Sequence, residues 1–191
     1  MANVEHDPWV KVKTFHGLPT DQVISALQKE IRRGNTENAV LLAYEMSITS
    51  SELETYLWQR LMVISVEDVG FGDTNASVLI HTLYQMIEKF NLSSGERKVM
   101  AIHGVRYLCS RLKDRSSDEM YNWVKRAVEK EGVRPVIPDY ALDMHTKKGR
   151  AMGRGKRHFY QEGAKVSPEM PGREASYLQR LMEILNKDEI A

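Results

Sequence analysis

The segment DMHTKKGRAMGRGKRHF, residues 143–159, combines residue types suited to binding a polyanion. Six cations and no acid lie between positions 147 and 157, and three glycines interrupt the run. The cations are Lys147, Lys148, Arg150, Arg154, Lys156 and Arg157. Such side chains bind phosphates and release condensed counterions, while Phe159 and Tyr160 offer faces for stacking unpaired bases. The alternative is a solvated charge run, or one that neutralises acids on a neighbouring subunit.

The same segment lacks the pattern of a nucleotide-binding loop. No GxxxxGK[ST] motif occurs in the chain, and no predicted strand leads into the glycines. Without backbone amides and a lysine around the phosphates, ATP hydrolysis by a P-loop mechanism is not expected. We therefore predict a contact surface, with the six cations as its nucleic-acid-binding residues, and neither a cofactor nor catalytic residues.

A small metal-dependent phosphoester hydrolase is the alternative function for this region. Its polar group would be Asp139, Asp143, His145 and His158. At helical spacing the two aspartates lie one turn apart, but His145 falls on a different face. No HExxH or HxH spacing is present. His81 and His103 lie within amphipathic helical patterns, where a structural histidine is commoner than a ligand, so we predict no metal site.

A second polar group consists of Glu67 and Asp68, with Asp73 close behind. Several carboxylates could bind a divalent cation through their oxygens. Alternatively, the acids cap the next helix and pair with nearby cations at a turn. Adjacent residues on a helix do not face the same way, so a structural role is favoured.

The elements that position these groups are predicted to be helices. Apolar residues recur at helical spacing in successive segments, most of them with start or stop signals. The segments are residues 21–34, 36–46, 51–70, 75–90, 93–112, 116–131 and a last helix around 178–185. Three of them open with the spacing of a capping box, at Ser51 with Glu54, Ser93 with Glu96, and Ser116 with Glu119.

The helix behind Ser116 has the most regular apolar stripe. Its members are Met120, Trp123, Val124, Ala127 and Val128. They match the i, i+3, i+4, i+7, i+8 template without a gap. We interpret the stripe as core or interface.

Long helices with short polar joins predict an all-α bundle of about seven or eight helices. The best strand candidate, Val133 to Ile137, is interrupted by Pro135. We predict an irregular N-terminal arm over 1–18 and one helical domain over 19–191. Within that domain we expect a regular bundle over 19–131, a less regular basic subregion over 132–172 and a C-terminal helix over 173–191.

Composition sets further bounds. The 191 residues are 42% hydrophobic and 28% charged, close to ordinary globular values. A formal net charge of +1 means that attraction to nucleic acid must come from a local patch. The single cysteine, Cys109, excludes an internal disulfide and lies on the apolar side of its helix, which favours buried packing. With neither a signal-peptide pattern nor an apolar run of roughly 18 residues, we expect a soluble, cytoplasmic protein.

Three segments in order resemble one family. They are SALQKEIRRGNTENAVLLAYEM, YLWQRLMVISVEDVGFGDTNA and PVIPDYALDMHTKKGRAMG. Together they resemble the C-terminal region of the RarA/MgsA family, clamp-loader-like AAA+ ATPases linked to recombination at stalled replication forks. The family element RRL…SEDxGLAD is matched by Gln59-Arg60-Leu61, by Ser65 to Gly70 and by Asp73. Thr74 stands where the family usually has proline.

The resemblance covers roughly residues 20–160 and implies a helical domain similar to the oligomerisation collar of clamp loaders. It implies a homo-oligomer, a tetramer in the family. This would be a non-catalytic, self-associating module for DNA replication, recombination and repair, present as a chain without the ATPase module. Its basic segment would contact DNA or a separate AAA+ ATPase subunit, with no membrane partner. That segment is more basic than its tyrosine-richer counterpart in the family.

Overall fold

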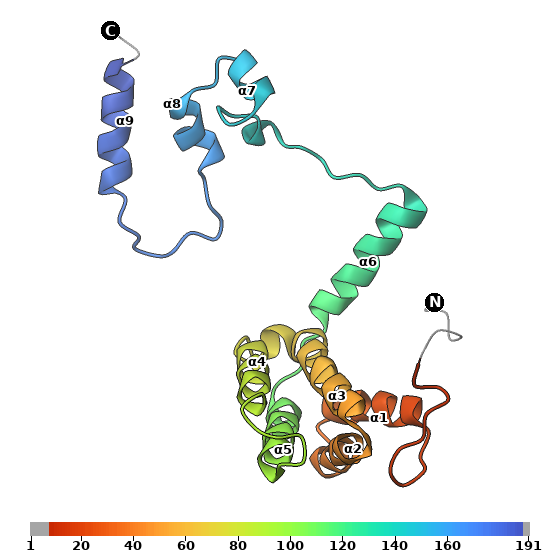
Figure 1. Cartoon of the computed structure of the whole chain (residues 1–191). Coiled ribbons are helices and arrows are strands. Elements are labelled where there is room, and N and C mark those ends of the chain that lie inside the picture. The colour runs from red at the N-terminus through yellow and green to blue at the C-terminus, as the bar shows by residue number, and fades with distance from the viewer. Residues whose placement is uncertain (1–7, 189–191) are drawn as a thin grey trace. The chain divides into compact units, whose positions relative to one another are not determined.

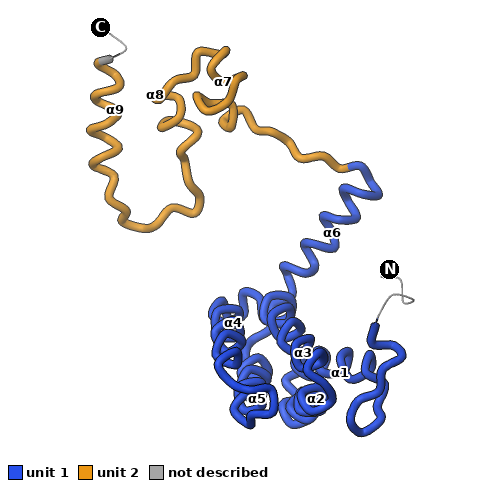
Figure 2. Tube along the Cα trace, in the orientation of Figure 1, with its two compact units in different colours: residues 1–132 blue, residues 133–191 orange. Residues whose placement is uncertain are grey.

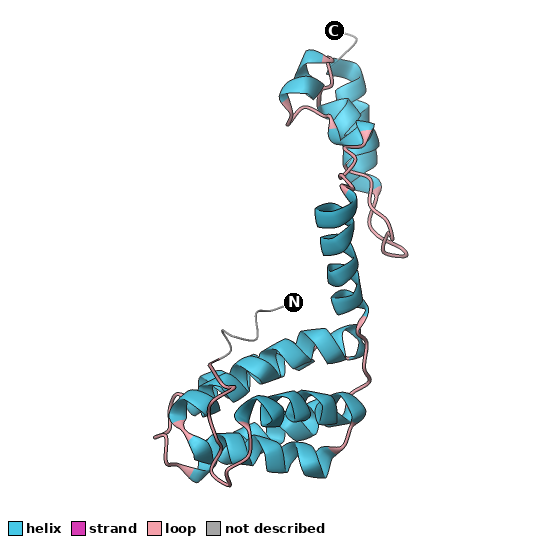
Figure 3. Ribbon diagram, turned by 90° about the vertical axis from the view of Figure 1, so that its right-hand side faces the viewer, coloured by secondary structure: helices cyan, strands magenta, loops and turns pink. Residues whose placement is uncertain are grey.

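A computed structural model describes residues 8–188, which form helices joined by turns and short connections (Figures 1 and 3). No strand occurs within these residues, and one isolated backbone bridge joins Lys13 to Pro19. The predicted all-α class is confirmed. Within the same residues, no helix is both long enough and apolar enough to cross a membrane.

The contacts divide the chain into two compact units, residues 1–132 and 133–191 (Figure 2). The boundary falls beside the position at which the sequence predicts a change from a regular bundle to a less regular subregion. The second unit also includes the helix predicted over 173–191. A single domain over 19–191 stays a prediction, and the two units are described in turn.

The first unit contains six α-helices. They are α1 (Thr20–Arg33), α2 (Thr36–Thr49), α3 (Ser51–Ile64), α4 (Ala76–Ile87), α5 (Gly95–Ser110) and α6 (Ser116–Glu131). A π-helical turn, η2 (Ser65–Val69), and a 3-10 turn, η3 (Gly70–Gly72), follow α3 directly. The polar element Ser65–Gly70 is therefore a helical continuation of α3 that ends at two glycines, as the sequence predicts.

Helices α1 to α5 surround the core of this unit. Helical spacing over residues 21–34 predicts one apolar face of Val23, Ile24, Leu27 and Ile31, of which Ile24 is half-buried and the other three are buried. Trp58 of α3 is the largest fully buried side chain. Gly104 of α5 lets the helices approach closely, because a Cβ there would lie 3.1 Å from Cδ1 of Ile80. Cys109 is buried, as predicted, and burial raises the pKa of its thiol.

The described part of the predicted N-terminal arm, residues 8–18, packs on the bundle through turns. The Trp9 and Tyr56 rings lie 5.3 Å apart. The His16 backbone N–H donates to Oε1 of Glu45 at 2.8 Å, and the Phe15 N–H donates to Oγ1 of Thr49 at 3.0 Å. Residues 1–7 of the predicted arm lie outside the described residues.

The helix starts differ by one or two residues from the predicted capping boxes. Ser50, and not Ser51, accepts a hydrogen bond from the Leu53 N–H at 3.2 Å. At α5, Ser94 replaces Ser93 in this role. At α6, the carboxylate of Asp114 accepts from the Ser116 N–H at 2.8 Å. Neighbouring residues offer side-chain oxygens that can accept the same hydrogen bond. Which of them caps the helix therefore depends on the backbone conformation at its start.

The stripe of α6 is not part of the core. Of its five apolar members only Ala127 is buried, whereas the Trp123 side chain is 65% exposed. Helix α6 meets the bundle near its start, where it contacts η2. From the sequence, this stripe was interpreted as either core or interface. The interpretation as core is wrong for unit 1.

The second unit contains four short elements and one longer helix. They are η4 (Asp139–Ala141), α7 (Lys147–Ala151), α8 (Lys156–His158), the π-helical turn η5 (Phe159–Gly163) and α9 (Ser176–Asp188). Glycines and prolines interrupt the pattern, so no helix of this unit before α9 exceeds two turns. The basic segment falls on α7, α8 and the turn between them.

Candidate functional site

The basic segment begins at a capped helix. Oγ1 of Thr146 accepts a hydrogen bond from the Gly149 N–H at 2.9 Å and donates to the carbonyl oxygen of Asp143 at 3.1 Å. This cap satisfies a backbone donor at the start of α7. Lys147 and Lys148 follow it and are exposed.

Gly149 is needed for packing. It is buried, and a Cβ at this position would lie 1.9 Å from the carbonyl oxygen of Asp143 and 2.6 Å from that of Leu142. The start of α7 therefore presses directly on the preceding loop. This glycine is not available for the close approach of a phosphate group.

Arg154 points into its own unit. Its Nη1 donates to the carbonyl oxygens of Asp139 at 2.8 Å and Leu142 at 3.0 Å. Its Nη2 donates to Oδ2 of Asp139 at 2.7 Å, and this hydrogen bond lowers the pKa of the Asp139 carboxyl. The side chain is only 17% exposed. Arg154 thus fastens η4 to the turn after α7, so this predicted contact residue has a structural role.

The other five cations are exposed. They are Lys147, Lys148, Arg150, Lys156 and Arg157. Arg150 makes one backbone contact, from Nη1 to the Met144 carbonyl oxygen at 3.0 Å. No acidic residue occurs in the same stretch. We call these five residues the cationic surface.

The aromatic residues behind the cationic surface pack with each other. The rings of His145 and Phe159 lie 5.0 Å apart edge to face, and those of Phe159 and Tyr160 lie 5.1 Å apart. Both Phe159 and Tyr160 are half-buried. Their rings support the fold of this unit, which leaves less aromatic area for base stacking than the sequence suggested.

Of the four polar residues of the alternative hydrolase, Asp143 contacts His145 and Asp139 contacts Arg154, while Nδ1 of His158 is buried with no hydrogen-bond partner among the described residues. Asp143 accepts from the His145 backbone N–H at 2.9 Å, and its Oδ2 lies 3.1 Å from His145 Nδ1. The hydrogen bonds from His145 lower the pKa of the Asp143 carboxyl, while Asp139 pairs with Arg154. Across the part of the chain that the structure describes, no three His, Cys, Asp or Glu residues are placed to hold a metal ion. The geometry therefore does not support the metal-site alternative.

The acidic pair of unit 1 is structural, as predicted. Asp68 is fully buried in η2, and Nε of Arg32 donates to its Oδ1 at 2.5 Å. Nη1 of Arg115 donates to the same oxygen, and Nε2 of Gln28 donates to Oδ2 at 2.9 Å. Three donors thus satisfy a buried carboxylate that would otherwise carry a large desolvation cost.

Glu67 shares the same donors at the edge of the bundle. Its Oε1 lies 3.0 Å from Gln28 Nε2 and 3.3 Å from Arg115 Nη1. Burial opposes the charged form of Arg115, but hydrogen bonds to Asp68 and Glu67 outweigh it and raise the pKa of this guanidinium. The members of this acid–arginine cluster are Gln28, Arg32, Glu67, Asp68 and Arg115.

Sequence reasoning missed the partners of these acids. Gln28 and Arg32 are one helical turn apart on the flank of the α1 stripe. Arg115 immediately precedes α6. The i, i+4 spacing of these two hydrogen-bond donors on α1 was a usable signal, but no local pattern links Arg115 to η2. Asp73 lies outside the cluster, because its Oδ2 accepts from the Tyr107 hydroxyl at 2.7 Å.

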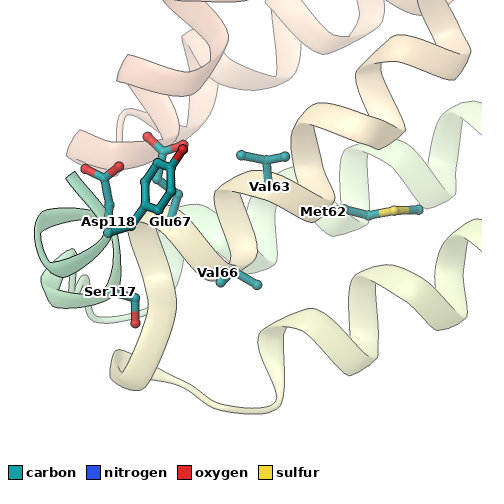
Figure 4. A pocket seen from close by; sticks show the side chains of 7 residues that line it. Met62, Val63, Val66, Glu67, Ser117 and Asp118 are labelled. Atoms are coloured by element: carbon teal, nitrogen blue, oxygen red, sulfur yellow. The ribbon is translucent and has the colours of Figure 1, made fainter. Parts of the chain in front are cut away.

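A cavity of about 510 Å³ lies beside the cluster, between the end of α3 and the start of α6 (Figure 4). Its apolar wall is formed by Met62, Val63 and Val66, with Tyr121 from α6. Its polar lining residues are Glu67, Ser117 and Asp118. Asp118 accepts from Arg115 Nη2, so the rim carboxylates are already paired with arginine.

The family model described as "MgsA AAA+ ATPase C terminal" matches residues 34–180. The chain is 29% identical over 142 residues to a replication-associated recombination protein A of Bacillus subtilis. It is 25% identical over 143 residues to the protein of the same name from Haemophilus influenzae. An ATPase named WRNIP1 from Dictyostelium discoideum is 26% identical over 140 residues.

These alignments cover most of this chain but a minor part of each relative. They include 72%, 72% and 73% of the chain, respectively. They include 32%, 30% and 15% of the three relatives. The chain therefore spans about a third or less of the length of the relatives that it matches.

Proposed function

Because this chain belongs to the family of MgsA AAA+ ATPase C-terminal domains, we propose that it is a non-catalytic, self-associating helical module for replication-associated recombination and DNA repair. In this proposal it works in the cytoplasm, forms a homo-oligomer and contacts DNA through the cationic surface. A AAA+ ATPase subunit is its protein partner. The family match and the names of the relatives support the replication-associated recombination role.

The observation that carries the DNA contact is the composition of the cationic surface. Five exposed cations fall within eleven residues that include no acid, although the whole chain has a net charge of only +1. Such a local excess attracts a polyanion and gains affinity from released counterions. Arg154 and Gly149 fix the loop that presents these side chains, so part of the ordering cost is met before binding.

The DNA contact is tested with a Lys147→Ala, Lys148→Ala, Lys156→Ala variant of the full chain. Anisotropy of labelled single-stranded and forked DNA is measured across a salt series. Each phosphate contact to a single strand contributes roughly 0.7 to the slope of log affinity against log salt. If all three lysines contact phosphates, the magnitude of this slope should therefore fall by about 2.

The matched control removes the exposed lysines Lys11, Lys13 and Lys187, which lie outside the segment. This variant has the same net charge as the first and should keep the parent slope. Equal slopes and affinities for both variants and the parent would overturn the DNA part of the proposal. Sedimentation of the parent chain without DNA tests self-association independently.

A further inference from the structure

Helix α6 exposes an amount of apolar surface that is unusual for the solvent side of a soluble protein. Its exposed apolar residues are Met120 (64%), Tyr121 (62%), Trp123 (65%), Val124 (42%) and Val128 (50%). They lie at helical spacing around Ala127, so they form a continuous stripe along one side of α6. We call this the α6 stripe. Most of the stability of a helix in a protein comes from packing of its amphipathic face, so a covering surface is expected for this stripe.

The charges beside the α6 stripe indicate which surface covers it. Glu119, Arg126 and Lys130 are spaced by seven and by four residues, so all three lie on one flank of the stripe. All are exposed, and none forms an ion pair among the described residues. The acid is near the start of the helix and the bases are near its end. If two copies of α6 lie side by side in opposite directions, Glu119 of one copy therefore lies beside Arg126 and Lys130 of the other.

We propose that the α6 stripe is a two-fold interface, in which α6 packs antiparallel against α6 of a second copy of this chain. This inference rests on the self-association in the proposed function and names the surface responsible. A two-fold axis across the middle of the stripe, between Trp123 and Val124, places Glu119 opposite position 128 of the partner. Glu119 then lies between Arg126 and Lys130 of the second copy, and symmetry repeats the contact.

The positions of the charges on one flank of α6 favour an antiparallel over a parallel pair of helices. A two-fold axis perpendicular to both helices brings each flank against the same flank of the partner, so unlike charges meet. In a parallel pair, the charged flank would face the opposite flank, which carries the exposed Lys125 beyond Tyr121 and Val128. Arg126 and Lys130 would then face the like charge of Lys125, because Asp118 on that side is paired with Arg115. The small Ala127, which lies opposite position 120 of the partner in this pairing, permits close approach of the two helices.

The test uses two charge variants of the full chain, Glu119→Lys and Arg126→Glu with Lys130→Glu. Each alone should weaken self-association at least tenfold, because like charges then meet across the axis. Mixed in equal amounts, the two should restore association as a heteromer, because both contacts become attractive again. Sedimentation equilibrium over micromolar concentrations gives the mass of each sample, and circular dichroism checks that each is folded.

A matched pair separates this contact from general attraction between oppositely charged molecules. Glu37→Lys is mixed with Lys11→Glu plus Lys13→Glu, which makes the same charge changes at exposed positions off α6. Each of these variants should associate like the parent, alone or mixed. As a second probe, Trp123→Ala removes the largest exposed ring and should lower the average mass without loss of helical signal.

The outcomes distinguish the inference from the proposed function. If the parent chain is a monomer throughout the concentration range, self-association fails and the α6 interface fails with it. If the parent associates but none of the α6 variants changes its mass, the inference alone is overturned. It is also overturned if the mixture of charge variants gains no mass over its components.

Discussion

The guanidinium of Arg115 donates a hydrogen bond to the buried carboxylate of Asp68, although the two residues are 47 positions apart. The neighbouring Asp114 N–H donates to the Asp68 carbonyl oxygen at 3.0 Å. The residues just before α6 are therefore fixed to the turn that follows α3. Gly70 takes part in this junction, because a Cβ there would lie 2.4 Å from the Asp114 carbonyl oxygen.

We predict that Asp68→Asn destabilises the first unit by about 2–3 kcal/mol, because two arginines lose their common anion. The first turn of α6 should also exchange its amide hydrogens faster. Urea denaturation and hydrogen exchange measure the two effects. Glu37→Gln, an exposed carboxyl on α2, is the control and should change neither. An unchanged exchange rate in α6 would show that Arg115 does not anchor this helix.

The buried ion pair of Arg97 and Glu54 leads to a second prediction. Arg97 Nε and Nη2 each lie 3.0 Å from a Glu54 oxygen, and Nη1 donates to the Ile87 carbonyl oxygen at 2.7 Å. Arg97→Met leaves the Glu54 carboxylate buried without its partner, so we expect a loss of about 3–5 kcal/mol in unfolding free energy. Arg106→Met, on the exposed side of the same helix, should cost little.

A double variant provides the internal check on this pair. Arg97→Met with Glu54→Met removes both charges together and should recover a large part of the lost stability. Denaturant midpoints of the parent, both single variants and the double variant complete the cycle. Additive effects of the two single changes would contradict direct coupling between these side chains.

Gly149→Ala should loosen the loop before α7, because the new Cβ would lie 1.9 Å from a carbonyl oxygen. The backbone must move, and overpacking of this kind costs about 1–3 kcal/mol. Hydrogen exchange by mass spectrometry should report faster exchange in residues 139–150. Gly155→Ala is the matched control, since nothing lies within 4 Å of its added Cβ. Similar exchange in both variants would contradict the packing role of Gly149.

Asp73 and Tyr107 should contribute a pH-dependent stability. The hydrogen bond from the Tyr107 hydroxyl lowers the pKa of the Asp73 carboxyl in the folded state, and the backbone N–H of Asn75 adds to this. A carboxyl with a lowered folded-state pKa stabilises the fold above its unfolded pKa, near 4. That stability is lost as the pH falls through the folded-state value.

The variant Tyr107→Phe should therefore reduce the loss of stability on acidification below about pH 4. Unfolding free energies measured between neutral pH and pH 2.5 test this. At neutral pH the variant should be less stable than the parent, and the two curves should converge in acid. Parallel curves over the whole range would contradict a Tyr107-dependent pKa of Asp73.

The sequence was most informative where structure depends on near neighbours. The apolar face of α1 followed from helical period alone: Val23, Leu27 and Ile31 are buried, and the fourth member, Ile24, is half-buried. Cap positions were displaced because paired serines, such as Ser50 and Ser51, offer the same chemistry to successive backbone N–H groups. Local pattern identifies the element, but the exact cap depends on how the chain enters it.

Contacts between residues far apart in the sequence could not be predicted, because they do not depend on near neighbours. Arg32 and Arg115 meet Asp68 across 36 and 47 positions, and no local period encodes such a meeting. The basic segment shows the same limit within one short stretch. In the sequence Arg154 is equivalent to Arg150, yet the loop around Asp139 captures one guanidinium and leaves the other exposed.

The capture of Arg154 affects how an alanine scan of this segment should be interpreted. Arg154→Ala would release η4 and disturb every neighbouring cation at once, so its loss of DNA affinity could exceed that of any residue that touches a phosphate. A ranking by effect size would then give first place to a scaffold residue. Arg154→Lys separates the roles, since it preserves the positive charge but cannot reproduce the forked set of hydrogen bonds.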